Sequence, residues 1–296
     1  GGNLAADTFD RYSHRAQEFP VTAAEWGVSG SVAGQPLTDH GKRVIERMGE
    51  YFRLEYPELV GAAASCDELF FYADDCLRDF QTATEFMKGM APECSDHLNI
   101  TTADAEVLFN QGGYQTEECG FASRDAMDSL LGGSRDNYAS YNRAHASFVS
   151  DVQAVVECCV DTTLCAMSKD NADAGHTGEE NEETTCTLSS IPSYYTGQYW
   201  SVINGSTPLA GYFASFFTLA ALNNMTLGLS GAERTLEEII GWYHDSSSTL
   251  GIADSSFTSP SFASTLASHL VASMHQAATG KNIDALAHGP GTSFVY

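Results

Sequence analysis

The chain has 296 residues, of which 43% are hydrophobic, and this apolar content excludes general disorder and suffices for one large domain or two ordinary ones. Its 39 Asp and Glu residues against 14 Lys and Arg residues give a formal net charge of -25, which repels nucleic acids and anionic lipids, so neither is expected as a partner. No apolar run reaches the roughly 18 residues that span a bilayer. The first residues also lack the basic start and apolar stretch of a signal peptide, so we expect any such peptide to have been removed.

The first third of the chain predicts a helix, a buried strand and a second helix in succession. Thr38 is a plausible N-cap for a helix that Pro57 closes, and its apolar stripe consists of Val44, Ile45, Met48 and Phe52. Residues 69–73 form a compact apolar run of strand length, and residues 77–90 return to helical spacing. This succession is the unit from which α/β sheets with helices on both faces are built.

The middle of the chain is predicted to be mainly helical. Residues 135–159 gather aromatic and Val side chains on one helical face, and residues 208–222 are apolar nearly all round, which is typical of a buried helix. Pro208 is suited to open that helix. Residues 168–186 hold six acidic side chains and predict a solvated loop. Two further helices are expected in residues 233–245 and 258–279.

The last residues, 292–296, are β-branched and aromatic, which predicts a second buried strand. A sheet covered on both faces usually has at least four or five strands. Only this segment and 69–73 qualify, so either weak strands lie within 97–122 or part of the sheet is missing from this chain. The predicted fold class is α/β with a mainly helical insertion. We expect the chain to have three parts. Residues 1–122 form the first part of the α/β domain, residues 123–285 form the insertion with the acidic loop 168–186, and residues 286–296 form the return strand of the α/β domain.

Eight cysteines accompany three N-glycosylation sequons, which begin at Asn99, Asn204 and Asn224. Together they favour a secreted or lumenal glycoprotein over a cytosolic protein. The cysteines include no C-x2-C pair, and the tight group Cys158, Cys159 and Cys165 has no histidine at ligand spacing, so no metal site is expected.

Asp74, Asp75 and Arg78 follow the predicted strand 69–73 and open the next helix. In open α/β sheets, ligands bind beyond the carboxyl ends of the strands, and helix N-termini attract anions. An arginine at this place is suited to hold a phosphate through two hydrogen bonds. The alternative is a surface Arg78 that pairs with Asp74 or Asp75.

A family resemblance is carried by two stretches, PLTDHGKRVIERMGEYFR and ADDCLRDFQTATEFMKGMAPEC. They resemble the histidine acid phosphatases, in the branch of the phytases and glucose-1-phosphatases, through Leu37, Thr38, Gly41, Gly49, Tyr51, Arg78, Phe86, Gly89, Pro92 and Cys94. The resemblance implies a phosphoglycerate-mutase-like sheet with helices on both faces, and hydrolysis of phosphomonoesters without a cofactor. In the family a histidine attacks phosphorus and becomes phosphorylated, arginines hold the phosphate oxygens, and the acid of a His-Asp pair protonates the leaving oxygen.

By position, Arg78 matches a phosphate-binding arginine of the family, and Asp74 is the candidate supporting residue. The sequence contains no Arg-His-Gly-x-Arg motif. His14, which Arg15 follows, is the nearest match and the alternative nucleophile. No apolar strand precedes it, which favours a surface loop histidine. The family's His-Asp pair follows a strand like 292–296. We therefore expect that the chain is incomplete at both ends, that nucleophile and acid lie outside these residues or come from another chain, and that these residues alone are inactive.

The resemblance also implies a disulfide pattern. It pairs Cys66 with Cys94, and it pairs Cys165 with Cys186, which closes the acidic loop. The family's partner of Cys119 lies downstream of this chain. A bond from Cys76 to Cys158 or Cys159 is a further expectation.

The leading hypothesis is a secreted acid phosphatase with N-glycans. Phytate specificity is not expected, because Leu219 stands where some phytase-like members carry a pocket acid and because an acidic surface repels a polyanion. The alternative is a catalytically inactive, phosphatase-like extracellular glycoprotein that serves as a structural or binding module, linked through cysteines into a homo-oligomer or extracellular assembly. A phosphoglycerate-mutase-like transferase, usually cytosolic, fits the sequons less well.

Overall fold

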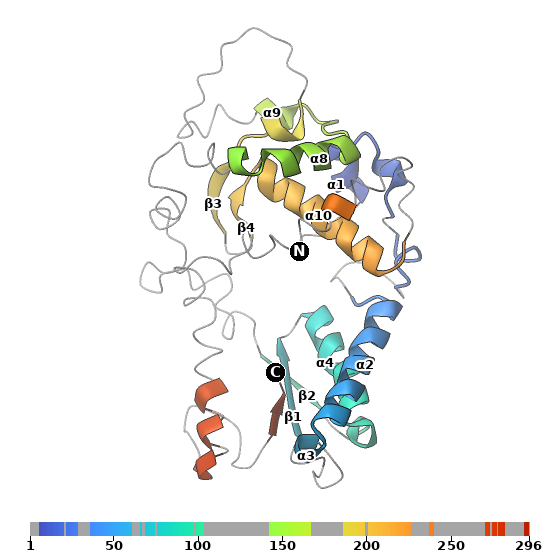
Figure 1. The fold of residues 1–296 in the computed structure, drawn as a ribbon, viewed down its shortest axis with the longest axis vertical. Coiled ribbons are helices and arrows are strands. Elements are labelled where there is room, and N and C mark those ends of the chain that lie inside the picture. Colours follow the sequence, from blue (N-terminus) through green and yellow to red (C-terminus); the bar gives the residue numbers. More distant parts are fainter. Residues whose placement is uncertain are drawn as a thin grey trace. The chain divides into compact units, whose positions relative to one another are not determined.

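The computed structural model describes residues 6–20, 22–28, 36–60, 66, 69–74, 76–97, 99–103, 142–166, 186–198, 201–225, 237–239, 270–272, 274–276, 278–281 and 293–295. The chain divides into two compact units (Figure 1). Unit 1 comprises Gly1–Val21 with Gln115–Ser259, and unit 2 comprises Thr22–Tyr114 with Pro260–Tyr296. Within the described ranges, no helix is both long enough and apolar enough to cross a membrane.

In the described part of unit 2, three strands form a parallel sheet with the order β2-β1-β5. β1 spans Leu69–Asp74, β2 spans Ile100–Ala103, and β5 spans Ser293–Val295. The strands predicted at 69–73 and 292–296 are confirmed and pair directly, with Phe70 opposite Phe294. β2 is a weak strand within 97–122, which is one of the two alternatives that the strand count left open. The α/β fold class is therefore confirmed.

The helix α4, Leu77–Met90, connects β1 to its parallel neighbour β2, and the 3-10 turn η3, Pro92–Cys94, follows it. This confirms the helix predicted over 77–90. Side chains alternate between the faces of a strand, so Leu69 and Phe71 of β1 share one face. Both are buried in one cluster with Met87 and Met90 of α4. One face of β1 therefore packs against the C-terminal half of α4.

The helix α2, Asp39–Glu55, begins at the predicted cap. The Oγ1 atom of Thr38 accepts a hydrogen bond from the backbone N–H of Gly41 at 2.9 Å, which satisfies one of the donors at the helix start. The helix ends before Tyr56, and a single helical turn, α3, Pro57–Val60, follows. The predicted helix between Thr38 and Pro57 is thus confirmed.

α2 lies alongside α4 in unit 2, and the two helices meet through glycines (Figure 1). A Cβ atom on Gly89 would lie 1.8 Å from the carbonyl oxygen of Glu46, and one on Gly49 would lie 2.2 Å from that of Phe86. Because only glycine permits this approach of two backbones, the Gly49 face of α2 is the one turned to α4. The predicted apolar stripe is accordingly not a buried face: Val44 and Met48 are 42% and 52% exposed.

The described part of unit 1 is mainly helical, around α10, Ser206–Leu222. This confirms the buried helix predicted over 208–222, although the helix begins at Ser206, so Pro208 lies in its first turn and does not open it. The helix α1, Ala6–Tyr12, and the 3-10 turn η1, Ala16–Glu18, join it through an aromatic cluster. Ring centroids of Phe9 and Phe216 lie 4.8 Å apart in that cluster. Its buried members are Phe9, Phe19, Phe213, Phe216 and Phe217.

The helix α8, Ala146–Val156, contacts α10 and confirms helical structure within the predicted segment 135–159. Phe148, Val152 and Val156 of its predicted face are buried, whereas Tyr138 and Tyr141 lie outside the described residues. The described part of unit 1 also contains α9, Thr163–Ala166, and η4, Leu188–Ser190. It further contains an antiparallel hairpin of β3, Tyr194–Gln198, with β4, Ser201–Asn204. The sequence reasoning missed this hairpin.

Three predicted segments are described only in part. Residues 237–239 are helical, within the helix predicted over 233–245. Residues 270–272, 274–276 and 278–279 are helical, within the one predicted over 258–279. The acidic loop predicted over 168–186 lies outside the described residues except for Cys186.

Candidate functional site

The sequence-predicted phosphate site lies at the carboxyl end of β1, in unit 2. β1 and β2 are parallel and Asp74 pairs with Ala103, so both strands end at the same edge of the sheet. Asp74 is the last residue of β1, and Arg78 is the second residue of α4. The side chain of Asp74 and all of Asp75 lie outside the description. The backbone thus brings Asp74 and Arg78 to one sheet edge, as predicted.

The start of α4 has the character of an anion site. Cys76 is its N-cap residue and makes no side-chain capping hydrogen bond. The backbone N–H groups of a helix's first turn and the helix dipole favour negative charge. The carboxylate of Asp79 in the first turn already exploits this preference.

The Arg78 side chain is 46% exposed, and its Nη2 atom lies 3.6 Å from Oδ2 of Asp79, which is 39% exposed. The surface-pair alternative names Asp74 or Asp75, whose side chains lie outside the described residues, so it stays a prediction beside the contact with Asp79. A long contact between two solvent-exposed groups contributes little to stability. The contact between Arg78 and Asp79 therefore costs little to break.

The far end of α4 fixes the helix to the sheet. The disulfide Cys66–Cys94 ties the turn after α4 to the residues before β1, with a Cα–Cα distance of 5.4 Å. Met90 and Ala91 are fully buried. The backbone N–H of Leu37 donates to Oε1 of Gln81 at 2.7 Å and so joins the segment before α2 to the first half of α4. These contacts fix the far end of α4 to the sheet and join its first half to the segment before α2.

His14, the alternative nucleophile, lies in an exposed turn of unit 1. The residues before it form α1, a helix, so the expectation that no buried strand leads into this histidine is confirmed. Its backbone N–H donates to the carbonyl oxygen of Glu157 at 3.3 Å. Arg15 beside it pairs with Glu18 at 2.7 Å, and this hydrogen bond raises the pKa of the arginine and lowers that of the carboxyl. The Arg15 guanidinium therefore has a carboxylate partner within its own turn.

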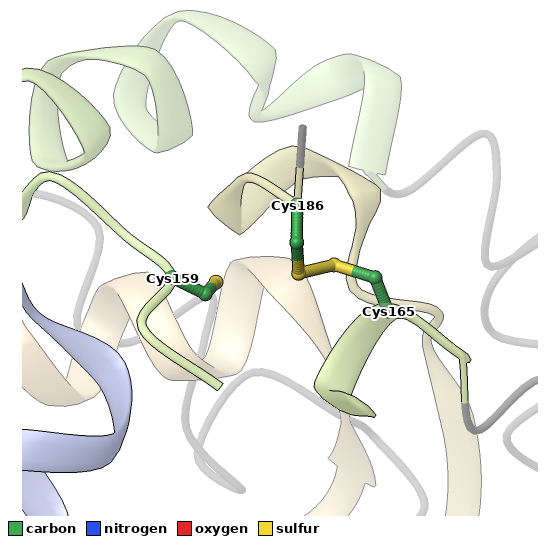
Figure 2. Close-up of side chains that lie close together, drawn as sticks. All are labelled: Cys159, Cys165 and Cys186. Carbon is green, nitrogen blue, oxygen red and sulfur yellow. A yellow bond between two sulfur atoms is a disulfide. The ribbon is translucent and has the colours of Figure 1, made fainter. Parts of the chain in front are cut away.

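The cysteines of unit 1 form a second cluster of chemically active side chains. The structure contains the disulfides Cys165–Cys186 and Cys158–Cys159, so the expected bond from Cys76 to one of the vicinal cysteines is wrong. The Sγ atoms of Cys159, Cys165 and Cys186 all lie within 4.8 Å of one another (Figure 2). Metal ions bind cysteine as the thiolate. In the disulfide form these sulfur atoms are therefore poor metal ligands.

The first residues of all three sequons are exposed: Asn99 before β2, Asn204 at the end of β4 and Asn224 after α10. Within the sequon at Asn204, however, Ser206 is 1% exposed. The side chain of Asn204 accepts a hydrogen bond from the Gly205 N–H at 2.8 Å.

A family model described as histidine phosphatase superfamily (branch 2) matches residues 14–238. Among solved structures, the phytase from Citrobacter braakii matches with a TM-score of 0.58 at 19% identity, over 88% of this chain and 62% of its own. Hafnia alvei phytase in complex with myo-inositol hexakis sulphate matches with a TM-score of 0.63 at 16% identity, over 98% and 66%. Klebsiella sp. ASR1 phytase matches with a TM-score of 0.55 at 17% identity, over 84% and 59%.

At these identities the structural likeness shows the fold. The chain spans less than two thirds of the length of each of these three phytases. No curated protein matches this chain significantly.

Proposed function

Because the chain belongs to branch 2 of the histidine phosphatase superfamily, we propose that it is part of a secreted acid phosphatase that hydrolyses phosphomonoesters. The observation that carries the proposal is the position of Arg78, in the first turn of α4 and directly beyond the carboxyl end of β1. Arg78 holds two oxygens of the phosphate, and the N–H groups of the helix start add to its attraction. Asp74, at the end of β1, supports the arginine.

The reaction proceeds through a phosphohistidine. The nucleophilic histidine and the acid that protonates the leaving oxygen belong to residues outside this sequence, which contains no Arg-His-Gly-x-Arg motif. The role of the present residues is to bind and orient the phosphate and to stabilise the charge of the transferred group. His14 is the alternative nucleophile, and its place after a helix, with Arg15 already paired, argues against it.

The substrate is a phosphomonoester with few charges. A net charge of -25 repels polyanions such as the hexakis sulphate bound by the Hafnia enzyme, unless the binding pocket is locally basic. A comparison of p-nitrophenyl phosphate with inositol hexakisphosphate at equal concentration tests this preference, and faster hydrolysis of the hexakisphosphate contradicts it.

Secretion and N-glycosylation belong to the same proposal. The disulfides Cys66–Cys94 and Cys165–Cys186 favour an oxidising compartment. The exposed side chains of Asn99, Asn204 and Asn224 are accessible to glycans. Enzymatic removal of N-glycans from the native protein is expected to lower its mass, and an unchanged mass refutes glycosylation.

The experiment for the phosphate site compares two arginine variants of the native protein. Hydrolysis of p-nitrophenyl phosphate is measured at acid pH for the wild type, Arg78→Ala and Arg47→Ala. Arg47 is the matched control because it is an exposed arginine on α2 of the same unit. Loss of kcat/KM in Arg78→Ala alone supports the proposal. An equal loss in both variants, or none in either, contradicts the role of Arg78.

A second candidate is an inactive, phosphatase-like extracellular module that has a structural or binding role, including assembly into homo-oligomers. The observation in its favour is the state of the nearest match to the nucleophile motif, where Arg15 is engaged by Glu18. Hydrolysis by the native protein that vanadate inhibits refutes this candidate. Complete inactivity at all pH values, with folded protein, favours it.

A further inference from the structure

Two disulfides of unit 1 lie side by side and form the sulfur cluster Cys158, Cys159, Cys165 and Cys186. Figure 2 shows the Cys159 side chain next to the Cys165–Cys186 bond, and the three Sγ atoms lie within 4.8 Å of one another. The backbone N–H of Cys159 donates to the carbonyl oxygen of Cys186 at 3.1 Å. This hydrogen bond keeps the two chain segments adjacent, so the Sγ atom of Cys159 lies within reach of Cys186.

Access differs sharply within the cluster. Cys158, Cys159 and Cys186 are 5%, 5% and 4% exposed. Cys165 is partly exposed, and its Sγ atom lies 3.2 Å from the Ser190 hydroxyl at the surface. The rate of thiol–disulfide exchange depends on access of the attacking thiolate to the sulfur. A thiol from solvent therefore reaches Cys165 before any other sulfur of the cluster.

We propose that Cys165 is a site of S-thiolation by small monothiols, and that the sulfur cluster passes the exchange on to the vicinal cysteines. The thiolate of the monothiol attacks Sγ of Cys165, a mixed disulfide forms there, and Cys186 leaves as a thiolate. Cys186 then attacks Sγ of Cys159, the Cys159–Cys186 disulfide forms, and Cys158 leaves as a thiolate and takes up a proton. One thiol and two disulfides enter the sequence, and one thiol and two disulfides result.

Proximity favours the second step. The Cys186 thiolate has the Sγ atom of Cys159 within 4.8 Å, so its attack takes place within the cluster and needs no second reagent. Before the exchange Cys186 is bonded to Cys165, and after it Cys186 is bonded to Cys159. The sulfur cluster thus has two disulfide patterns, and a small thiol selects between them.

The first test maps disulfides in the wild-type protein. The native protein is treated with reduced glutathione as the monothiol, remaining thiols are alkylated, and peptides are identified by mass spectrometry without reduction. The expected products are glutathionylated Cys165, a Cys159–Cys186 disulfide and alkylated Cys158. Alkylated Cys186 together with an intact Cys158–Cys159 bond overturns the relay, and glutathione on any other cysteine of the cluster overturns the entry site.

The second test starts the same step without a reagent. In Cys165→Ser the Cys186 thiol has no original partner, and the expected product is a Cys159–Cys186 disulfide with a thiol at Cys158. The matched control is Cys66→Ser in unit 2, where Cys94 loses its disulfide partner and is expected to remain a thiol. Cys76 cannot replace that partner, because it lies at the other end of the 14-residue helix α4, about 20 Å away. A thiol at Cys186 in Cys165→Ser contradicts the proposal. If this variant does not fold, the glutathione map of the wild type decides.

Discussion

The close contact of α2 with α4 predicts that Gly89→Ala destabilises unit 2. The new Cβ would lie 1.8 Å from the Glu46 carbonyl oxygen and 2.8 Å from the Glu50 backbone nitrogen, and both are backbone atoms that cannot turn aside. The two helices must separate by at least about 1 Å to bring this contact to a normal distance. Overpacking of this kind costs ~1–3 kcal/mol and sometimes more.

The helix itself gains from the substitution, because alanine is about 1 kcal/mol more favourable than glycine inside a helix. The clash involves backbone atoms, so we expect the upper end of the overpacking cost, about 3 kcal/mol. After the gain in helix propensity of about 1 kcal/mol, the free energy of unfolding should fall by about 2 kcal/mol. In a protein of 296 residues, such a loss lowers Tm by roughly 3 °C. Urea titration and thermal unfolding followed by circular dichroism measure both quantities.

Gly41→Ala in α2 is the matched control for this prediction. Its Cβ would meet the Thr38 Oγ1 side-chain atom at 3.2 Å, a contact that a small shift relieves. We expect a change in the free energy of unfolding below about 1 kcal/mol. The reasoning is refuted if Gly89→Ala is as stable as the wild type, or if Gly41→Ala is the more damaging of the two.

Three further predictions concern stability. Thr38→Ala removes the N-cap of α2 and should cost about 1 kcal/mol in urea titration, while Thr38→Ser keeps the cap; equal loss in both variants contradicts the cap. Cys94→Ser removes the Cys66–Cys94 disulfide, whose sequence separation is 28, and should lower the free energy of unfolding by about 3–4 kcal/mol. If the variant is still less stable than the wild type after both have been reduced, the loss has another cause. Burial, with the Glu238 carboxylate as a second cause, raises the pKa of Asp151 above its ordinary 3.8. A raised carboxyl pKa means that the folded state loses stability as pH rises from the ordinary to the raised value. Asp151→Asn should therefore stabilise the protein at pH 7 and not at about pH 3, and the opposite order contradicts the assignment.

The local hydrophobic pattern was sufficient to predict those helices and strands that bury one contiguous apolar run. β1, α4 and α10 appear where the sequence predicts them, because their apolar residues follow the period of a strand or fill nearly all sides of a helix. β2 could be placed only within a range, since its residues Ile-Thr-Thr-Ala carry little apolar signal and pair through the backbone. The β3–β4 hairpin was missed for a related reason: its aromatic residues fit a core or a surface as well as a strand.

Contacts between elements were the harder part to predict. The glycines at 49 and 89 were noted in the sequence only as matches to a family pattern, and their reason is a helix crossing that brings backbones together. The sulfur cluster depends on the approach of residues 158–159 to the bond between Cys165 and Cys186, which no spacing reveals. At the candidate site, strand and helix positions placed Arg78 at the sheet edge. Its neighbour Asp79 was not foreseen, because side-chain pairing at a helix start follows from rotamers and not from pattern.

The most direct test of the central claim is the hydrolysis of p-nitrophenyl phosphate by the native protein and its Arg78→Ala variant at acid pH. If Arg78 holds the phosphate at the start of α4, kcat/KM should fall by about 100- to 1,000-fold in Arg78→Ala, the range for loss of one donor to a transition state. Arg47→Ala should keep the activity of the wild type. A wild type without activity, or an Arg78→Ala variant as active as the wild type, contradicts the claim.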